Sequence, residues 1–220
     1  MRLIARLTKG ESVRFVSHLD ILRLLQRAFR RAEIPLGYSQ GFNPHPLLSF
    51  ATALSTGYTS DAEWIDVKLD GDMDTARFIS SVNAALPSGF EFKEAYAVED
   101  RLPSLTALLE SAEYRITFSA DTDANELKKE LTALLAGEII VEKRTKGGLK
   151  NVDIRPQVIE ANVTEEAGRA VLTVKGVLNA SGSLNIELLM GALARLSGKS
   201  YDYSVHRVNV EFTGGRSTPV

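Results

Sequence analysis

The sequence contains no cysteine, so this chain offers no disulfide, no thiolate nucleophile, no cysteine-bound zinc and no iron–sulfur ligand. No apolar run approaches the roughly 18 residues that a membrane-spanning helix needs. The start of the chain, MRLIARLTKG, lacks the apolar segment and cleavage site of a signal peptide. We therefore expect a cytoplasmic protein with no membrane partner.

Motifs for common cofactors and metals are also missing. The sequence has no phosphate-cradling GxxxxGK, no dinucleotide fingerprint after a strand, no HExxH and no nucleophile elbow. Carboxylates are frequent between Asp61 and Asp74, but Asp70-Gly71-Asp72 is typical of a turn and the others of the solvent side of a strand. We expect no cofactor and no metal ion.

The composition is that of a globular protein whose charge is unevenly distributed. The 220 residues suit one large or two small domains, and the net charge is −2. Residues 1–50 hold eight Lys/Arg and three Asp/Glu, whereas residues 51–110 hold four and eleven. The overall balance argues against a protein that coats DNA, while the N-terminal excess leaves a local positive surface for a specific anionic partner.

The hydrophobic pattern predicts a β-α-β-β-α-β order in the first half, and the same order with one strand added or extended in the second. In chain order, the first half contains a strand at 2–8, a helix at 17–34, an extended stretch at 47–56, a strand at 63–69, a helix at 74–86 and a strand at 90–98. The second half contains a strand at 112–119, a helix at 122–136, a hairpin of 138–145 with 149–160 turning at Gly147-Gly148, a strand at 168–177, a helix at 183–197 with Ser183 as candidate cap, and a strand at 201–212.

This order predicts an α+β protein of two tandem ferredoxin-like (βαββαβ) halves with antiparallel sheets. The expected domains are residues 1–100 and 112–220, with a linker at 101–111. Such sheets cover one face with helices. The other face would carry Arg2, Arg6 and Trp64, either as an open RNA platform or buried between the two halves.

The helix predicted at 17–34 has two contrasting faces. Ser17 and Asp20 form a capping signature at its start, and Pro35 limits its end. At 100° per residue the apolar side chains gather on one side. The other side holds four arginines, which are either a solvated face or an anion-binding surface: Arg23, Arg27, Arg30 and Arg31. Arginine favours the second interpretation, because guanidinium binds phosphate bidentately and stacks on bases.

A stiff aromatic loop, GYSQGFNPHP, follows that helix at 37–46. Asn43-Pro44 and His45-Pro46 restrict the backbone, and the loop presents Tyr38, Phe42 and His45. Beside an arginine row, these rings would clamp an unpaired nucleotide. The alternative is that the aromatic rings anchor the loop in the core and His45 caps another group of the protein.

This stretch resembles the radical SAM-linked protein family, whose members are domains of unknown function beside or fused to B12-binding radical SAM proteins. The resemblance spans residues 11–70 most strongly, continues to DIRP at 153–156, and rests on the SHLD and S-x-GF-x-P-x-P elements. It implies an RNA-related role and a radical SAM partner, but no activity. The matching positions are Ser17, His18, Asp20, Arg23, Arg27, Ser39, Gly41, Phe42, Pro44, Pro46 and Ser49.

A second basic cluster lies on the hairpin predicted in the second half. It consists of Lys143, Arg144, Lys146, Lys150 and Arg155, with Asp153 as the one acid among them. A basic hairpin tip reaches a phosphate backbone, although a solvated hairpin has the same composition.

Three hypotheses follow. The first is a non-catalytic RNA-binding module that uses the helix arginines, the aromatic loop and the basic hairpin. The second is a protein-interaction or substrate-presenting subunit of a radical SAM enzyme. The third is a metal-independent ribonuclease in which His18 and His45 act as acid and base, if the fold brings them together.

Overall fold

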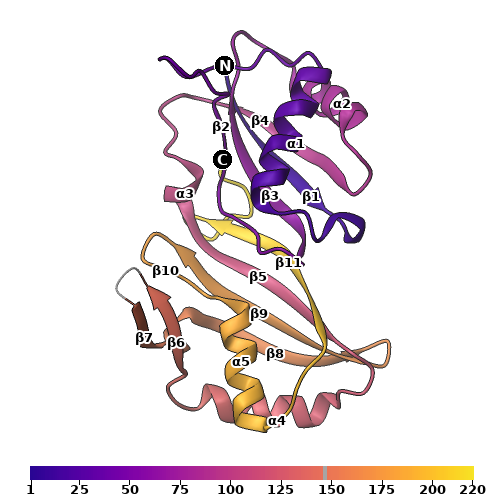
Figure 1. Ribbon diagram of the computed structural model, residues 1–220, viewed down its shortest axis with the longest axis vertical. Helices are drawn as coiled ribbons and strands as arrows, with labels where there is room; N and C mark the ends of the chain where they lie inside the picture. Colours follow the sequence, from indigo (N-terminus) through magenta and orange to yellow (C-terminus); the bar gives the residue numbers. More distant parts are fainter. Residues whose placement is uncertain (146–147) are drawn as a thin grey trace. The chain divides into compact units, whose positions relative to one another are not determined.

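The computed structural model describes residues 1–145 and 148–220 and shows an α+β protein, as the element order predicted (Figure 1). The chain forms two compact units. Unit 1 comprises Met1–Leu109 and His206–Val220, and unit 2 comprises Glu110–Val205. The segment 206–220 thus belongs with the N-terminal residues, which the division into 1–100 and 112–220 does not anticipate. In the described part of the chain, no helix has the length and apolarity to cross a bilayer.

The sheet of unit 1 is built around its first strand. β1 (Arg2–Lys9) runs antiparallel to both β3 (Thr59–Lys68) and β4 (Phe90–Val98), its two neighbours. β2 (Leu48–Phe50) pairs antiparallel with β3. The order β2-β3-β1-β4 fits a ferredoxin-like βαββαβ unit. The last strand, β11 (Tyr203–Phe212), meets β3 in parallel, with His206 opposite Thr59 and Arg207 opposite Ser60.

Two helices cover one face of this sheet. α1 (His18–Arg31) and α2 (Thr75–Ala85) lie side by side on it (Figure 1). Alternate residues of β1, including Leu3 and Leu7, point toward the helices and are fully buried. Three phenylalanine rings fill the centre with centroids 5.7 to 6.1 Å apart: Phe29, Phe78 and Phe92. Burial of this apolar surface is what holds α1 in place.

The opposite face of the sheet is closed by residues of unit 1 itself. Trp64 is 2% exposed, with Tyr96 stacked at 6.3 Å and Phe212 edge-on at 5.8 Å between ring centroids. Arg2 forms a bidentate ion pair with Asp66, and Arg6 forms an ion pair with Glu94. These residues are therefore committed to the fold, and the open RNA platform expected at Arg2, Arg6 and Trp64 is wrong.

Unit 2 contains antiparallel strands and two long helices. β9 (Arg169–Asn179) pairs antiparallel with β5 (Leu109–Phe118), with β8 (Val158–Glu166) and with the short β10 (Gly182–Ser183). α4 (Ala124–Leu135) and α5 (Ile186–Ser197) bury apolar faces that include Leu131 and Leu193. A separate hairpin pairs β6 (Ile140–Thr145) with β7 (Gly148–Asp153).

Several elements differ from the expected ones for local reasons. The strand expected at 149–160 is broken at Asp153, because Pro156 lies in the 3-10 turn η2 (Arg155–Gln157). Ser183 does not cap α5; the Asn185 side chain accepts the backbone N–H of Leu188 instead. The extended stretch 47–56 pairs as a strand over Leu48–Phe50, and the helix expected at 17–34 ends at Arg31. Two short elements complete unit 1: η1 (Glu11–Val13) and α3 (Leu105–Leu108).

Candidate nucleic-acid interface

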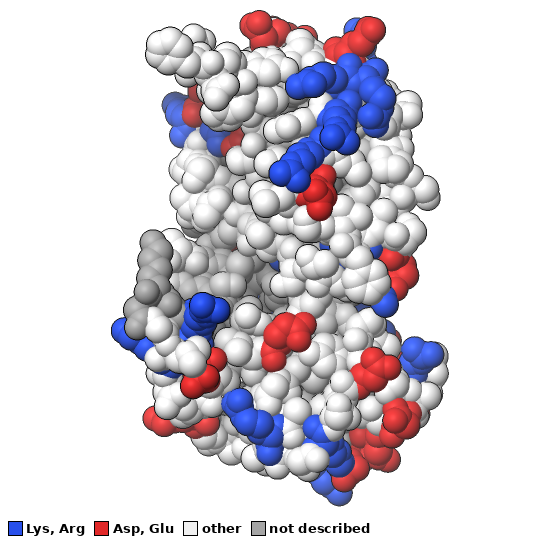
Figure 2. All heavy atoms as spheres, in the orientation of Figure 1, with Lys and Arg blue, Asp and Glu red and all other residues white. Residues whose placement is uncertain are grey.

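The exposed face of α1 carries the four arginines together. Ser17 caps the helix by accepting the N–H of Asp20, as predicted. Ile21, Leu25, Ala28 and Phe29 are buried, which turns the arginine side outward. Figure 2 shows Lys and Arg side chains gathered in a stripe over α1. We call this surface the arginine face: Arg23, Arg27, Arg30 and Arg31, all exposed.

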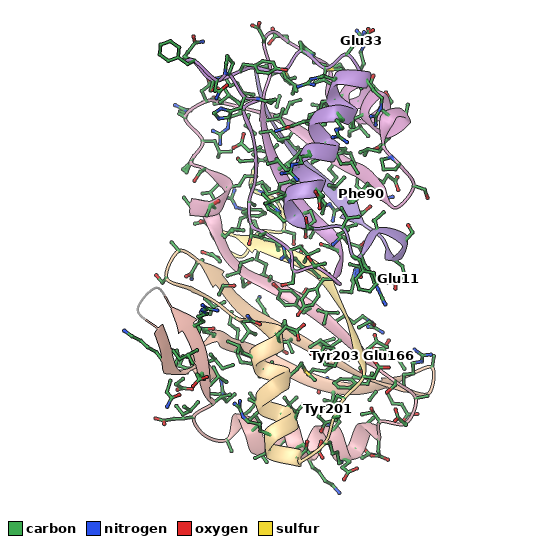
Figure 3. The ribbon with its side chains drawn as sticks, in the orientation of Figure 1. Glu11, Glu33, Phe90, Glu166, Tyr201 and Tyr203 are labelled. Carbon is green, nitrogen blue, oxygen red and sulfur yellow. The ribbon has the colours of Figure 1, made fainter. Side chains whose placement is uncertain are left out.

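The four arginines differ in their partners. Arg23 Nη1 lies 3.1 Å from Asp20 Oδ1, and Arg31 Nη2 donates to the Ala85 carbonyl at 2.6 Å. Within the described residues, the guanidinium groups of Arg27 and Arg30 form neither an ion pair nor a hydrogen bond. Glu33, at the C-terminal end of α1 (Figure 3), also forms no ion pair with described residues. The arginine face therefore carries uncompensated positive charge.

Asp20 is the one acid on this face, and it is held ionised. Its pKa is lowered chiefly by the hydrogen bond that the Ser17 hydroxyl donates to Oδ2 at 2.7 Å, and further by Arg23. A charged carboxylate at the first turn also complements the helix dipole. Asp20 therefore offsets the positive charge at the N-terminal end of the arginine face, and the uncompensated charge lies at Arg27 and Arg30.

The aromatic loop after α1 is pinned at its base and exposed at its tip. Tyr38 forms a β-bridge with Pro46, and the Ser39 N–H donates to the His45 carbonyl at 2.9 Å. His45 Nδ1 lies 2.8 Å from the Ser39 hydroxyl. Phe42 is fully exposed, and Tyr38 is 42% exposed. The alternative in which both rings plug into the core is wrong, while His45 does bond within the loop.

The structure does not bring His18 and His45 to a shared partner. The His18 ring packs edge-on against Phe50 with centroids 4.9 Å apart, whereas His45 bonds to Ser39. Each histidine therefore has a local structural contact. This arrangement gives no support to an acid–base pair made from them.

The sequence suggested no role for the third histidine, His206. His206 Nδ1 lies 2.8 Å from the Thr59 hydroxyl, and Nε2 lies 3.1 Å from Asp61 Oδ2. These groups line a polar hollow of about 620 Å³ that also contains Glu11, Phe90 (both labelled in Figure 3) and Glu91. Its lining holds three carboxylates and two lysines, so it offers no net positive charge to an anion. No short-range sequence signal links His206 to Thr59, because the two are 147 residues apart.

The basic cluster of unit 2 contains exposed cations as well as one that is hydrogen-bonded within the protein. Lys143 lies directly opposite Lys150 in the β6–β7 ladder, an arrangement of like charges that disfavours the hairpin by itself. Arg144 is exposed, and Lys146 lies outside the described residues. Arg155 is committed: Nε donates to the Leu135 carbonyl at 2.8 Å and Nη1 to the Val158 carbonyl at 3.1 Å. Its guanidinium thus satisfies a backbone carbonyl at the end of α4 and another at the start of β8.

Metal ligands are not clustered in the described ranges 1–145 and 148–220, where no group of three or more His, Asp or Glu side chains could hold an ion. The arrangement found on unit 1 is instead an α+β domain with one cationic helix face. The chain belongs to a family of uncharacterised proteins conserved in bacteria (DUF2344), whose model matches residues 2–188. That description names neither a radical SAM enzyme nor a B12-binding protein.

Comparison with solved structures supports the fold class. The chain resembles one in the crystal structure of a Cbf5-Nop10-Gar1 complex, with a TM-score of 0.50 and 13% sequence identity. The likeness covers 94% of this chain and 48% of that one, so this chain spans about half of its length. A putative glycine cleavage system transcriptional repressor aligns at 10% identity over 94% and 97% of the two chains, but its TM-score is 0.24. No curated protein matches the sequence.

Proposed function

We propose that this protein is a non-catalytic RNA-binding module whose primary contact is the arginine face of α1. The observation that carries the proposal is that Arg27 and Arg30 are exposed and, within the described residues, lack carboxylate partners. Guanidinium groups held one turn apart on a rigid helix bind phosphates bidentately. The pinned aromatic loop adds Tyr38 and Phe42 as stacking surfaces for unpaired bases.

One further surface and one protein partner are part of the proposal in a lesser role. Lys143, Arg144 and Lys150 on the β6–β7 hairpin supply a second phosphate contact. The association with a B12-binding radical SAM protein rests on the sequence resemblance alone. It predicts that the two proteins co-purify under gentle conditions.

The test measures RNA affinity as a function of salt. Arg27 and Arg30 are replaced by Ala together, and a matched control replaces Arg77 and Arg101, two exposed arginines elsewhere in unit 1. Binding to a short random-sequence single-stranded RNA pool is followed by fluorescence anisotropy at several salt concentrations. The first double variant is expected to bind more weakly, with a slope of log K against log salt smaller by about 1.4.

The control double variant is expected to retain the slope of the wild type. If the Arg27/Arg30 variant binds as tightly as the wild type, the arginine face is not the RNA contact. Enrichment of a protein partner instead of RNA on the wild-type chain would reassign this face to protein docking.

A further inference from the structure

A groove runs along one edge of the arginine face. One wall is α1, and the other is the end of α2 with the turn that follows it, residues 85–87. Its volume is about 590 Å³. Sequence patterns on α1 alone could not show it, because the second wall comes from a segment more than 50 residues further along the chain. The residues that define its character are Arg23, Leu24, Arg27, Arg31, Leu86 and Pro87.

The floor of the groove is apolar and firmly held. Val16, Leu24 and Leu86 are half-buried and pack against the hydrophobic core of unit 1. Pro87 is exposed at the rim. An apolar surface that is anchored from below yet open from above suits a flat apolar group, since covering it removes water from both partners.

The cationic wall is partly immobilised at its two ends. Arg31 is fixed by the Ala85 carbonyl at 2.6 Å, and Arg23 by Asp20 at 3.1 Å. Arg27 lies between them at i+4 spacing, with no carboxylate partner among the described residues. The ends of the groove are therefore ordered, and the guanidinium at its centre remains free to meet a ligand.

We propose that this groove receives one unpaired RNA base, with its plane against Leu24 and Leu86 and an adjoining phosphate on Arg27. A site for phosphate alone would need no apolar floor, and an apolar ligand would not need three guanidinium groups. A nucleotide satisfies both, because guanidinium stacks on bases and binds phosphate. A base within a duplex is stacked on its neighbours and cannot reach the floor. This inference rests on the proposed RNA-binding function and identifies single-stranded RNA as its substrate class.

The experiment uses the full chain and a single-stranded RNA that carries one 2-aminopurine, free or annealed to its complement. The key variant is Ala85→Phe, which fills the groove without changing its charge, since Ala85 lines the wall. The matched control is Ala84→Phe, the exposed neighbour that does not line the groove. Circular dichroism verifies that both variants fold.

The wild type is expected to alter 2-aminopurine fluorescence and to bind the single strand about tenfold more tightly than the duplex. Ala85→Phe should abolish both effects, and Ala84→Phe should preserve them. If Ala85→Phe does not fold, Arg27→Lys replaces it: the charge is kept but the bidentate phosphate contact that positions the base is lost, so the fluorescence change should fall by at least half.

Two outcomes would overturn the inference in distinguishable ways. If RNA binds through Arg27 but Ala85→Phe and Arg27→Lys behave as the wild type, or if the duplex binds as tightly, the groove is not a base site and the proposed function survives. If the wild type binds no RNA at all, both the inference and the proposed function fail.

Discussion

The arginines of unit 1 lie in two contrasting environments. Arg2, Arg6 and Arg207, on the sheet, each form an ion pair with a carboxylate: Asp66, Glu94 and Glu63. The arginine face of α1 has four guanidinium groups and one nearby acid, Asp20. All of these arginines look alike in a count of charges. What separates a structural arginine from an available one is whether the fold places a carboxylate within reach.

The Glu63–Arg207 pair is the extreme of the structural kind. Its atoms are 3.1 Å apart, and both side chains are at least 96% buried. Lys9 is buried beside them and donates to the Arg14 carbonyl at 2.8 Å. Burial lowers the pKa of Lys9, and Arg207 lowers it further, while Glu63 opposes the change. Removal of one charge here unbalances the others, whereas removal of an exposed arginine leaves nothing unsatisfied.

The largest effect should come from Arg207→Met. Glu63 would remain buried without its main partner, so we expect unit 1 to lose about 3 kcal/mol of unfolding free energy. Trp64 is the one tryptophan of the chain and lies in unit 1, so its fluorescence during urea denaturation reports on this unit. Arg27→Ala is the comparison and should change stability by less than about 0.5 kcal/mol. Equal losses in the two variants would refute the division into structural and available arginines.

A second prediction adds a second carboxylate to the arginine face, beside Arg30. Gln26→Glu places an acid four residues before Arg30, the favourable orientation for an ion pair on a helix. RNA affinity should fall severalfold and the salt slope by about 0.7, while stability should rise by about 0.3 kcal/mol. Gln26→Met is the uncharged control. Undiminished RNA binding by Gln26→Glu would show that Arg30 does not meet a phosphate.

A third prediction concerns pH and the buried Lys9. Because its folded-state pKa lies below the ordinary value of 10.5, the unfolded chain binds more protons between the two values. Stability should therefore rise with pH as the ordinary value is approached. The difference in unfolding free energy between wild type and Lys9→Met, followed by Trp64 fluorescence, isolates this contribution. A difference that is flat with pH would mean that Lys9 is charged in the folded state throughout.

The smallest effect should come from Asp20→Asn. Loss of the exposed ion pair releases Arg23, so the affinity for RNA should rise about twofold. Asparagine retains a hydrogen-bonding side chain at this position, and Asp20→Ala is the companion variant that separates charge from hydrogen bonding. Weaker RNA binding by both variants would mean that Asp20 itself contacts the RNA.

Local features of the fold were readable from the sequence. The Ser17 cap, the buried and exposed sides of α1, and the Asp74 cap of α2 depend on residues within a few positions of one another. Helix periodicity therefore predicted which arginines share a face. Whether that face is exposed could not be read from the sequence, because exposure depends on which other elements pack against the helix.

Contacts between side chains far apart in the chain could not be predicted from the sequence. Arg2 and Asp66 are 64 residues apart, and Glu63 and Arg207 are 144 apart, so no spacing rule connects them. The same limit hid the contact of His206 with Thr59 and the groove wall at Leu86 and Pro87. The hydrogen bonds of Arg155 were hidden as well, because its acceptors are backbone carbonyls, which every sequence contains.

The division of unit 1 between two segments also affects how the protein is made. Residues 110–205 separate the two parts, and a ribosome needs about 5 to 20 s to synthesise that stretch. During this interval two residues that unit 1 needs have not yet been synthesised: Arg207, the ion-pair partner of Glu63, and Phe212, whose ring packs against Trp64. Unit 2 begins later in the chain than unit 1, yet all of its residues are synthesised before the last residues of unit 1. The nascent chain thus emerges with an incomplete N-terminal sheet, a period in which binding by chaperones or premature pairing of that sheet edge competes with correct closure.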